Sequence, residues 1–113
     1  MKPKYDLEER TFLFARDCRN YIKSLKSTIS NIEDGKQLIR SSGSVGANYI
    51  EANEKLGDKD FLFRLKISRK EAKESLYWLR LLKTQNNDDS VDILIQESIE
   101  LRKILSAIIN KSS

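Results

Sequence analysis

The stretch Ser41-Ser42-Gly43-Ser44-Val45-Gly46-Ala47 consists almost entirely of small residues, and its conformation decides the fold. Inside a helix, each of its two glycines costs roughly 1 kcal/mol relative to alanine, so a glycine-rich loop is the alternative. Apolar residues nevertheless keep a heptad-like spacing through it, at Leu38, Val45, Tyr49 and Ala52. We therefore predict one helix over about 34–53, whose small side chains let a neighbouring backbone come close.

Three more helical segments surround this one. The first follows Pro3, with Asp6 as its N-cap, and a loop over 27–34 then leads to a cap at Asn31 or Asp34. The third runs from about 59 to 82 or beyond after an N-cap at Asp58, and the fourth covers about 90–111. Apolar stripes at helical spacing predict the core. The stripe of the first segment is Leu7, Phe14, Cys18, Tyr21, Ile22 and Leu25. That of the third is Phe61, Leu65, Ser68, Ala72, Leu76 and Leu79, and that of the fourth is Leu94, Ser98, Leu101, Leu105 and Ile108.

Four helices of this length, joined by short polar loops, predict a single all-α domain over 1–113, folded as an antiparallel up-down-up-down four-helix bundle. The chain has only four glycines and one proline, so it offers little turn chemistry for an all-β fold.

The composition argues against catalysis and cofactors. The chain has no histidine, the commonest general base and transition-metal ligand, and a single cysteine, Cys18, which can form neither an internal disulfide nor a thiolate zinc cluster. We expect a buried core thiol, no metal, no cofactor and no enzymatic activity. The longest apolar run has four residues, far below the roughly 18 needed to span a bilayer, and no signal peptide begins the chain. We expect a cytoplasmic protein with no membrane association.

The charge is concentrated in the third segment. The chain carries 21 Lys and Arg against 17 Asp and Glu, and residues 54–83 alone contain nine basic and five acidic residues, which equals the whole excess of four. At about 100° per residue, one arc of about 100° holds five of its basic side chains with one aromatic among them; these residues are Lys66, Arg69, Lys70, Lys73, Arg80 and Tyr77. Such a stripe indicates phosphate binding. The alternative is an ordinary solvated face, neutralised by acids of the fourth helix.

A second apolar set on the third segment lies off the core stripe, at Phe63, Ile67, Trp78 and Leu81. A bundle this small has one core, so surplus large side chains indicate a second buried surface, most simply between copies of the chain. The alternative is a wide stripe that touches two neighbouring helices. Asn48 and Glu51 flank the apolar line of the second segment, and we expect them to bond the neighbouring helix.

The residues 44–52 also carry a resemblance. They resemble the signature S-[VI]-[PG]-A-N-I-A-E-[GA] of small four-helix-bundle proteins encoded within intervening sequences of bacterial 23S ribosomal RNA genes, and residues 59–68 resemble the stretch that follows it in that family. Tyr49 and Ile50 depart from the pattern by being larger. The matching positions are Ser44, Val45, Gly46, Ala47, Asn48, Glu51 and Ala52.

The resemblance implies a ring-forming bundle, commonly a homopentamer, without a known enzymatic activity. Related accessory variability proteins of diversity-generating retroelements form basic rings that bind nucleic acid and a reverse transcriptase. Our first hypothesis is therefore a homo-oligomer that binds RNA or another polyanion through the basic stripe, with Tyr77 stacking on a base. The alternative is a protein-interaction module, such as a reverse-transcriptase adaptor, that binds no nucleic acid and docks a partner through Phe63 and Trp78.

Overall fold

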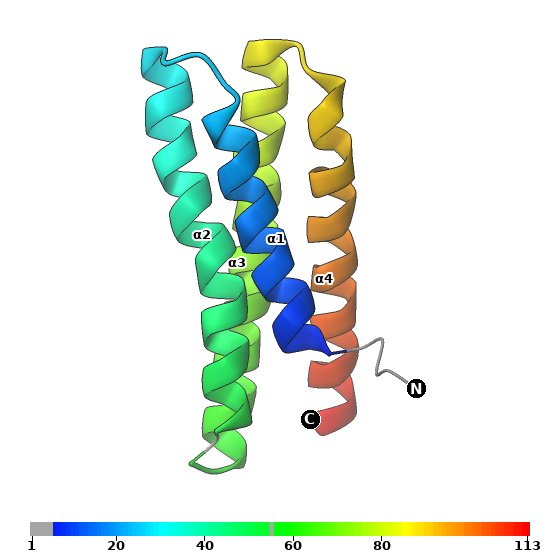
Figure 1. Ribbon diagram of the computed structural model, residues 1–113. Helices are drawn as coiled ribbons and strands as arrows, with labels where there is room; N and C mark the ends of the chain where they lie inside the picture. Colours follow the sequence, from blue (N-terminus) through cyan, green and yellow to red (C-terminus); the bar gives the residue numbers. More distant parts are fainter. Residues whose placement is uncertain (1–5, 55) are drawn as a thin grey trace.

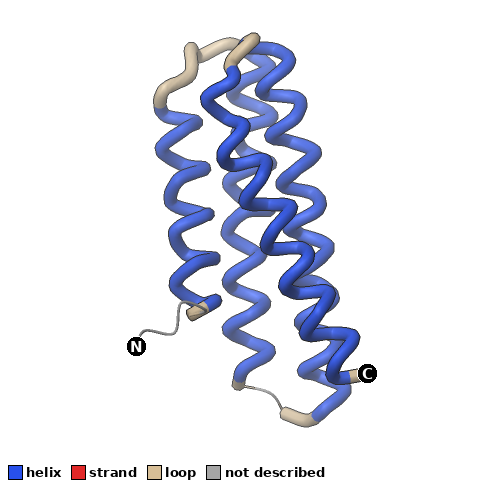
Figure 2. Tube along the Cα trace, turned by 90° about the vertical axis from the view of Figure 1, so that its right-hand side faces the viewer, coloured by secondary structure: helices blue, strands red, loops and turns tan. Residues whose placement is uncertain are grey.

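The computed structural model describes residues 6–54 and 56–113. The described residues form no strand and fold into α1 (Leu7–Lys23), α2 (Ile29–Asn53), α3 (Asp58–Asn86) and α4 (Asp92–Ser112), with a short 3-10 turn, η1 (Asp89–Val91), ahead of α4. Consecutive helices run in opposite directions (Figure 1), and the loops lie at the two ends of the molecule (Figure 2). The predicted all-α four-helix bundle is confirmed.

The small-residue stretch is helical, as predicted, and its side chains meet both neighbouring helices. Ser41 Oγ lies 2.9 Å from Ser75 Oγ of α3. One turn later, the carbonyl of Val45 accepts a 2.6 Å hydrogen bond from Ser68 Oγ. On the opposite side, a Cβ added to Gly46 would lie 2.7 Å from Thr11 Oγ1 of α1. The stretch therefore lets α2 pack closely against α1 and α3 at the same level of the bundle.

The sequence predicted the N-caps of the first three helices, and the structure confirms one of these predictions and contradicts two. Asp6 caps α1 as predicted, since its carboxylate accepts the Glu9 N–H at 3.2 Å. The loop before α2 is shorter than predicted, because Thr28 is the N-cap and accepts the Asn31 N–H at 3.1 Å. The expectation of a cap at Asn31 or Asp34 is wrong. Asp58 is the first residue of α3 and not its cap, which is Gly57.

The core follows the predicted stripes with small shifts. Leu38, Val45, Leu65, Leu79 and Leu101 are fully buried. Phe61 and Leu76 are only partly buried. At the end of α4, the buried residue is Ile109, whereas the predicted Ile108 lies beside the core.

The signature positions lie on several faces of α2. The expected bond from Asn48 to a neighbouring helix is absent among the described residues; its Nδ2 instead donates to Ser44 O of its own helix at 2.9 Å. Glu51 is exposed. The two larger residues, Tyr49 and Ile50, fit because Tyr49 lies at the edge of the core and Ile50 points outward. Close helix packing in this segment is therefore due to Gly46 and the serines.

Candidate nucleic-acid interface

The residues predicted to contact nucleic acid lie together on the side of α3 opposite the core, and we call them the basic face: Lys66, Arg69, Lys70, Lys73, Tyr77 and Arg80. All are exposed except Arg69, which is half-buried. Arg69 reaches toward α4, where its Nη1 donates to Ser106 Oγ at 3.4 Å. Arg69 therefore forms the edge of the basic face next to α4.

Most of these cations have no acidic partner. Within the described residues, Lys66, Lys73 and Arg80 form no ion pair, and Lys70 Nζ lies 4.0 Å from the nearest carboxylate oxygen, Glu71 Oε2. The acids of α4 pair elsewhere, for example Glu97 with Arg10 of α1 at 2.7 Å. In the part of the chain that the structure describes, no acid of α4 pairs with a cation of the basic face, and an ordinary solvated face stays the alternative prediction.

Two acids of α3, Glu71 and Glu74, are paired by an arginine of α2. Arg40 pairs with both Glu71, at 3.3 Å, and Glu74. Glu71 is only 7% exposed. Glu74 also accepts the Trp78 indole N–H at 3.0 Å, and this bond, together with Arg40, lowers the pKa of Glu74. Arg40 thus pairs both acids from α2, while Glu74 also borders the same hollow as Lys70, Lys73 and Arg80.

Tyr77 stands at the middle of the basic face, 54% exposed. Its ring contacts Trp78 edge to face, with centroids 5.0 Å apart. It lines two hollows at once. One, of about 360 Å³, is bordered by Lys70, Lys73 and Arg80 and by Glu74, the acid that Arg40 pairs. The other, of about 500 Å³, lies between α3 and α4.

The four residues predicted for an oligomer interface, Phe63, Ile67, Trp78 and Leu81, do not form one equally exposed patch. Phe63 is 59% exposed, whereas the other three are partly buried. Trp78 packs against the core, and Leu81 lines the hollow between α3 and α4 beside Tyr77. Phe63 is thus the side chain of this set with most surface left for a partner.

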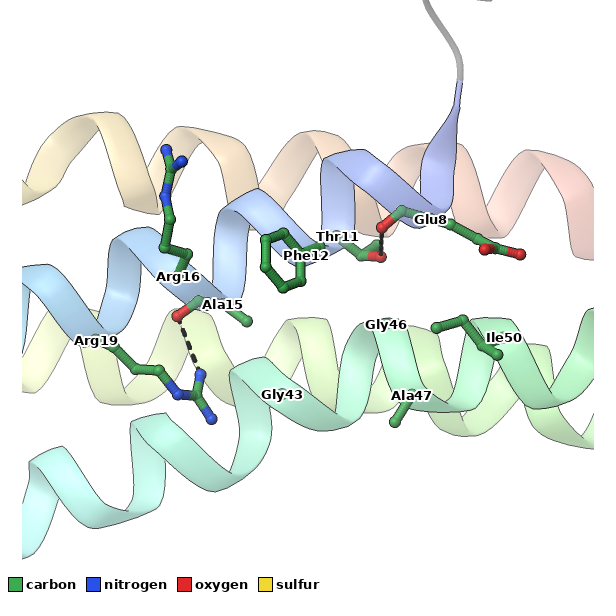
Figure 3. A pocket seen from close by; sticks show the side chains of 10 residues that line it. All are labelled: Glu8, Thr11, Phe12, Ala15, Arg16, Arg19, Gly43, Gly46, Ala47 and Ile50. Carbon is green, nitrogen blue, oxygen red and sulfur yellow. Dashed lines mark hydrogen bonds between the residues drawn. The ribbon is translucent and has the colours of Figure 1, made fainter.

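The structure also shows an apolar groove of about 440 Å³ between α1 and α2, which we call the α1/α2 groove (Figure 3). Phe12 and Ile50, 61% and 44% exposed, lie along it. Gly43 and Gly46 leave its floor without side chains. At one end, Arg19 donates to Ala15 O and Ile39 O, at 3.0 and 3.3 Å, and so ties α1 to α2.

Sequence reasoning missed two features of these surfaces. The α1/α2 groove could have been suspected from Phe12 and Ile50, large apolar residues that lie off the predicted core stripes of their helices. Arg102 was also missed. It is exposed and lies four residues before Ser106, the partner of Arg69, so it continues the basic face onto α4.

The described residues contain no group of three or more His, Cys, Asp or Glu side chains that could hold a metal ion. Cys18 is buried, and burial raises the pKa of its thiol to about 12. None of the helices in the described ranges has the length and apolar character that crossing a membrane requires.

Comparison with known proteins places the chain in a family. Residues 4–107 match the family model of the 23S rRNA-intervening sequence protein. No curated protein matches the chain. A crystal structure from Bacteroides thetaiotaomicron VPI-5482, of a protein with unknown function from the S23 ribosomal protein family, is 31% identical, with a TM-score of 0.80 over 90% of this chain and 96% of that one. The chain belongs to the family of 23S rRNA-intervening sequence proteins.

Proposed function

We propose that this protein is a cytoplasmic, non-enzymatic, homo-oligomeric bundle that binds RNA through the basic face, extended by Arg102. The observation that carries the proposal is the set of unpaired cations on one face of α3. Lys66, Lys73 and Arg80 have no acidic partner among the described residues, and Arg40 of α2 pairs the neighbouring Glu71 and Glu74. A surface of this kind attracts a phosphate backbone.

The non-enzymatic part of the proposal rests on the chain's reactive groups. The single thiol is buried with a pKa raised to about 12, so it is protonated at neutral pH and shielded from substrate. The sequence has no histidine to act as a general base. The contacts proposed for the basic face are with phosphates, which position an RNA without identifying its sequence.

Salt-dependent RNA binding tests the proposal. Fluorescence anisotropy with a labelled RNA hairpin should show a logarithmic affinity that falls linearly with the logarithm of salt concentration. The quadruple variant K66Q/R69Q/K70Q/K73Q should bind much more weakly and with a slope shallower by about 3. The matched control K23Q/K26Q/K36Q/K111Q loses the same charge away from the basic face. If both variants lose affinity equally, binding is a matter of net charge and the basic face is not the site.

The oligomeric part of the proposal uses two different apolar surfaces. Phe63 protrudes from α3, whereas the α1/α2 groove is a concave surface on another side of the bundle. When one copy's protrusion enters the next copy's groove, the contact is head to tail, and such contacts form a ring where the rotation between copies closes. A ring, a pentamer by resemblance to the family, would bring several basic faces together.

A protein-interaction module without RNA binding is the second candidate. The exposed ring of Phe63, beside the partly buried Trp78, favours it. Ionic strength separates the two candidates, because an apolar interface keeps its affinity in salt whereas phosphate contacts weaken steeply. A partner bound equally at low and high salt, with no RNA bound at either, would support the second candidate.

A further inference from the structure

The hollow between α3 and α4 lies directly beside the basic face. It measures about 500 Å³, within the range of roughly 300–1,000 Å³ typical of small-molecule sites. Its walls are largely apolar, with Leu76 and Leu81 from α3 and Ile95 and Ile99 from α4. Its acid, Asp92, is bound to Lys83 at 2.6 Å, and Glu74, which borders the neighbouring basic hollow, is paired with Arg40, so neither carboxylate is free.

Tyr77 joins this apolar hollow to the basic one along α3. The same ring lines both, and so does Arg80, which has no ion pair within the described residues. The edge-to-face contact with Trp78 holds the Tyr77 ring in place before any ligand binds. A phosphate held by Lys73 and Arg80 would therefore lie one side chain away from an aromatic ring and an apolar recess.

We propose that the hollow between α3 and α4 accepts an unpaired nucleobase, which packs against Tyr77 while Lys73 and Arg80 bind the adjoining phosphates. The proposal rests on the proposed RNA binding and narrows it to RNA that is single-stranded at this point. A paired base stays inside its helical stack and cannot enter a recess, whereas an unpaired base can leave the stack and pack on an aromatic side chain. Such packing tolerates any base, because every base has a π face.

The test compares a single-stranded RNA of about 12 nucleotides with the same sequence annealed to its complement, by anisotropy at one salt concentration. The full-length protein should prefer the single strand. Y77A should lower the affinity for the single strand roughly fivefold or more and leave the duplex affinity unchanged. Y77F keeps the ring and should bind as the unaltered protein does. Because Tyr77 is exposed, thermal unfolding by circular dichroism should show Y77A folded.

The outcomes separate this inference from the function on which it rests. Equal affinity for single strand and duplex, or a Y77A variant that binds the single strand normally, overturns the base site and leaves the basic face standing. Loss of binding in Y77F also overturns it, since the hydroxyl and not the ring would then make the contact. If neither RNA binds at low salt, both proposals fall. Quenching of Trp78 fluorescence by the single strand, abolished in Y77A, supports the base site independently.

Discussion

Gly46 is a position where one added carbon would collide with a neighbouring helix. A Cβ there would lie 2.7 Å from Thr11 Oγ1 and 3.1 Å from Thr11 Cβ, whereas a Cβ on Gly43 would meet only the end of the Arg19 side chain, at 3.2 Å. In G46A we expect overpacking to outweigh the gain in helix propensity and lower the free energy of unfolding by about 1–2 kcal/mol.

G43A is the matched control for G46A. The flexible Arg19 side chain can shift, so the variant should be unchanged or stabilised by up to about 1 kcal/mol. Urea denaturation of both variants measures the difference. Equal stabilisation by the two alanines would mean that α1 and α2 do not approach closely at Gly46.

The stability of the protein should fall in alkaline solution because of two buried groups. Burial raises the pKa of Cys18 from 9.0, and that of Tyr21 from 10.0, to about 12 in each case, with Asp88 adding to the shift at Tyr21. Both groups are neutral when protonated, so the unfolded chain loses these protons at lower pH than the folded one. Their contribution is complete below pH 9 and is lost as the pH rises toward 12.

Denaturant unfolding across this pH range measures the effect, and C18A should show a shallower decline than the unaltered protein. The slope is the readout, because C18A also lowers stability at every pH through lost packing. An identical slope in C18A would show that the thiol ionises as readily in the folded chain as in the unfolded one.

At the scale of elements, α2 controls the charge of α3 through Arg40. R40Q leaves Glu71, which is 7% exposed, with only the Lys70 ammonium at 4.0 Å as a partner among the described residues, and we expect a loss of about 1–2 kcal/mol in stability. It also leaves Glu74 and Glu71 to attract Lys70 and Lys73 more strongly, so RNA affinity should fall several-fold although no residue of the basic face has changed. R16Q, which removes a cation paired with Asp17, is the matched control for net charge. Equal RNA affinity in R40Q and R16Q would show that Arg40 does not influence RNA binding through Glu71 and Glu74.

Features that depend on the sequence of a single helix could be predicted. The period of Leu38, Val45 and Ala52 predicted α2 through its glycines, and the helical wheel placed Lys66, Lys73 and Arg80 on one side of α3. Features that depend on the contact between two helices could not be predicted. The pairing of Arg40 with Glu71, the α1/α2 groove and the role of Arg102 require the register between neighbouring helices, which periodicity within a helix does not contain. Thr28 was missed because Asn31, three residues on, offered an equally good cap.

At the scale of the whole molecule, a head-to-tail assembly makes a prediction that a two-fold dimer does not. F63E should remove the protrusion and I50E should block the α1/α2 groove, so each variant alone should be monomeric. Each retains the surface that the other has lost. A mixture of the two should therefore form a one-to-one dimer and stop there.

Light scattering after size-exclusion chromatography gives the masses of the unaltered protein, each variant and the mixture. A mixture that stays monomeric, while the unaltered protein assembles, would mean that the two surfaces do not bind each other. An unaltered protein that is monomeric at tens of micromolar would contradict assembly altogether.

The hydrogen bonds that join Ser41 to Ser75 and Val45 to Ser68 also have a consequence for the order of folding. They lie within one helical hairpin, between segments adjacent in sequence, and such local contacts form early because they close short loops. The seam between α1 and α4 instead joins distant parts of the chain, through Arg10 and Glu97 and around a hollow of about 240 Å³. We therefore expect the hairpins between neighbouring helices to form first and the seam between α1 and α4 to close last.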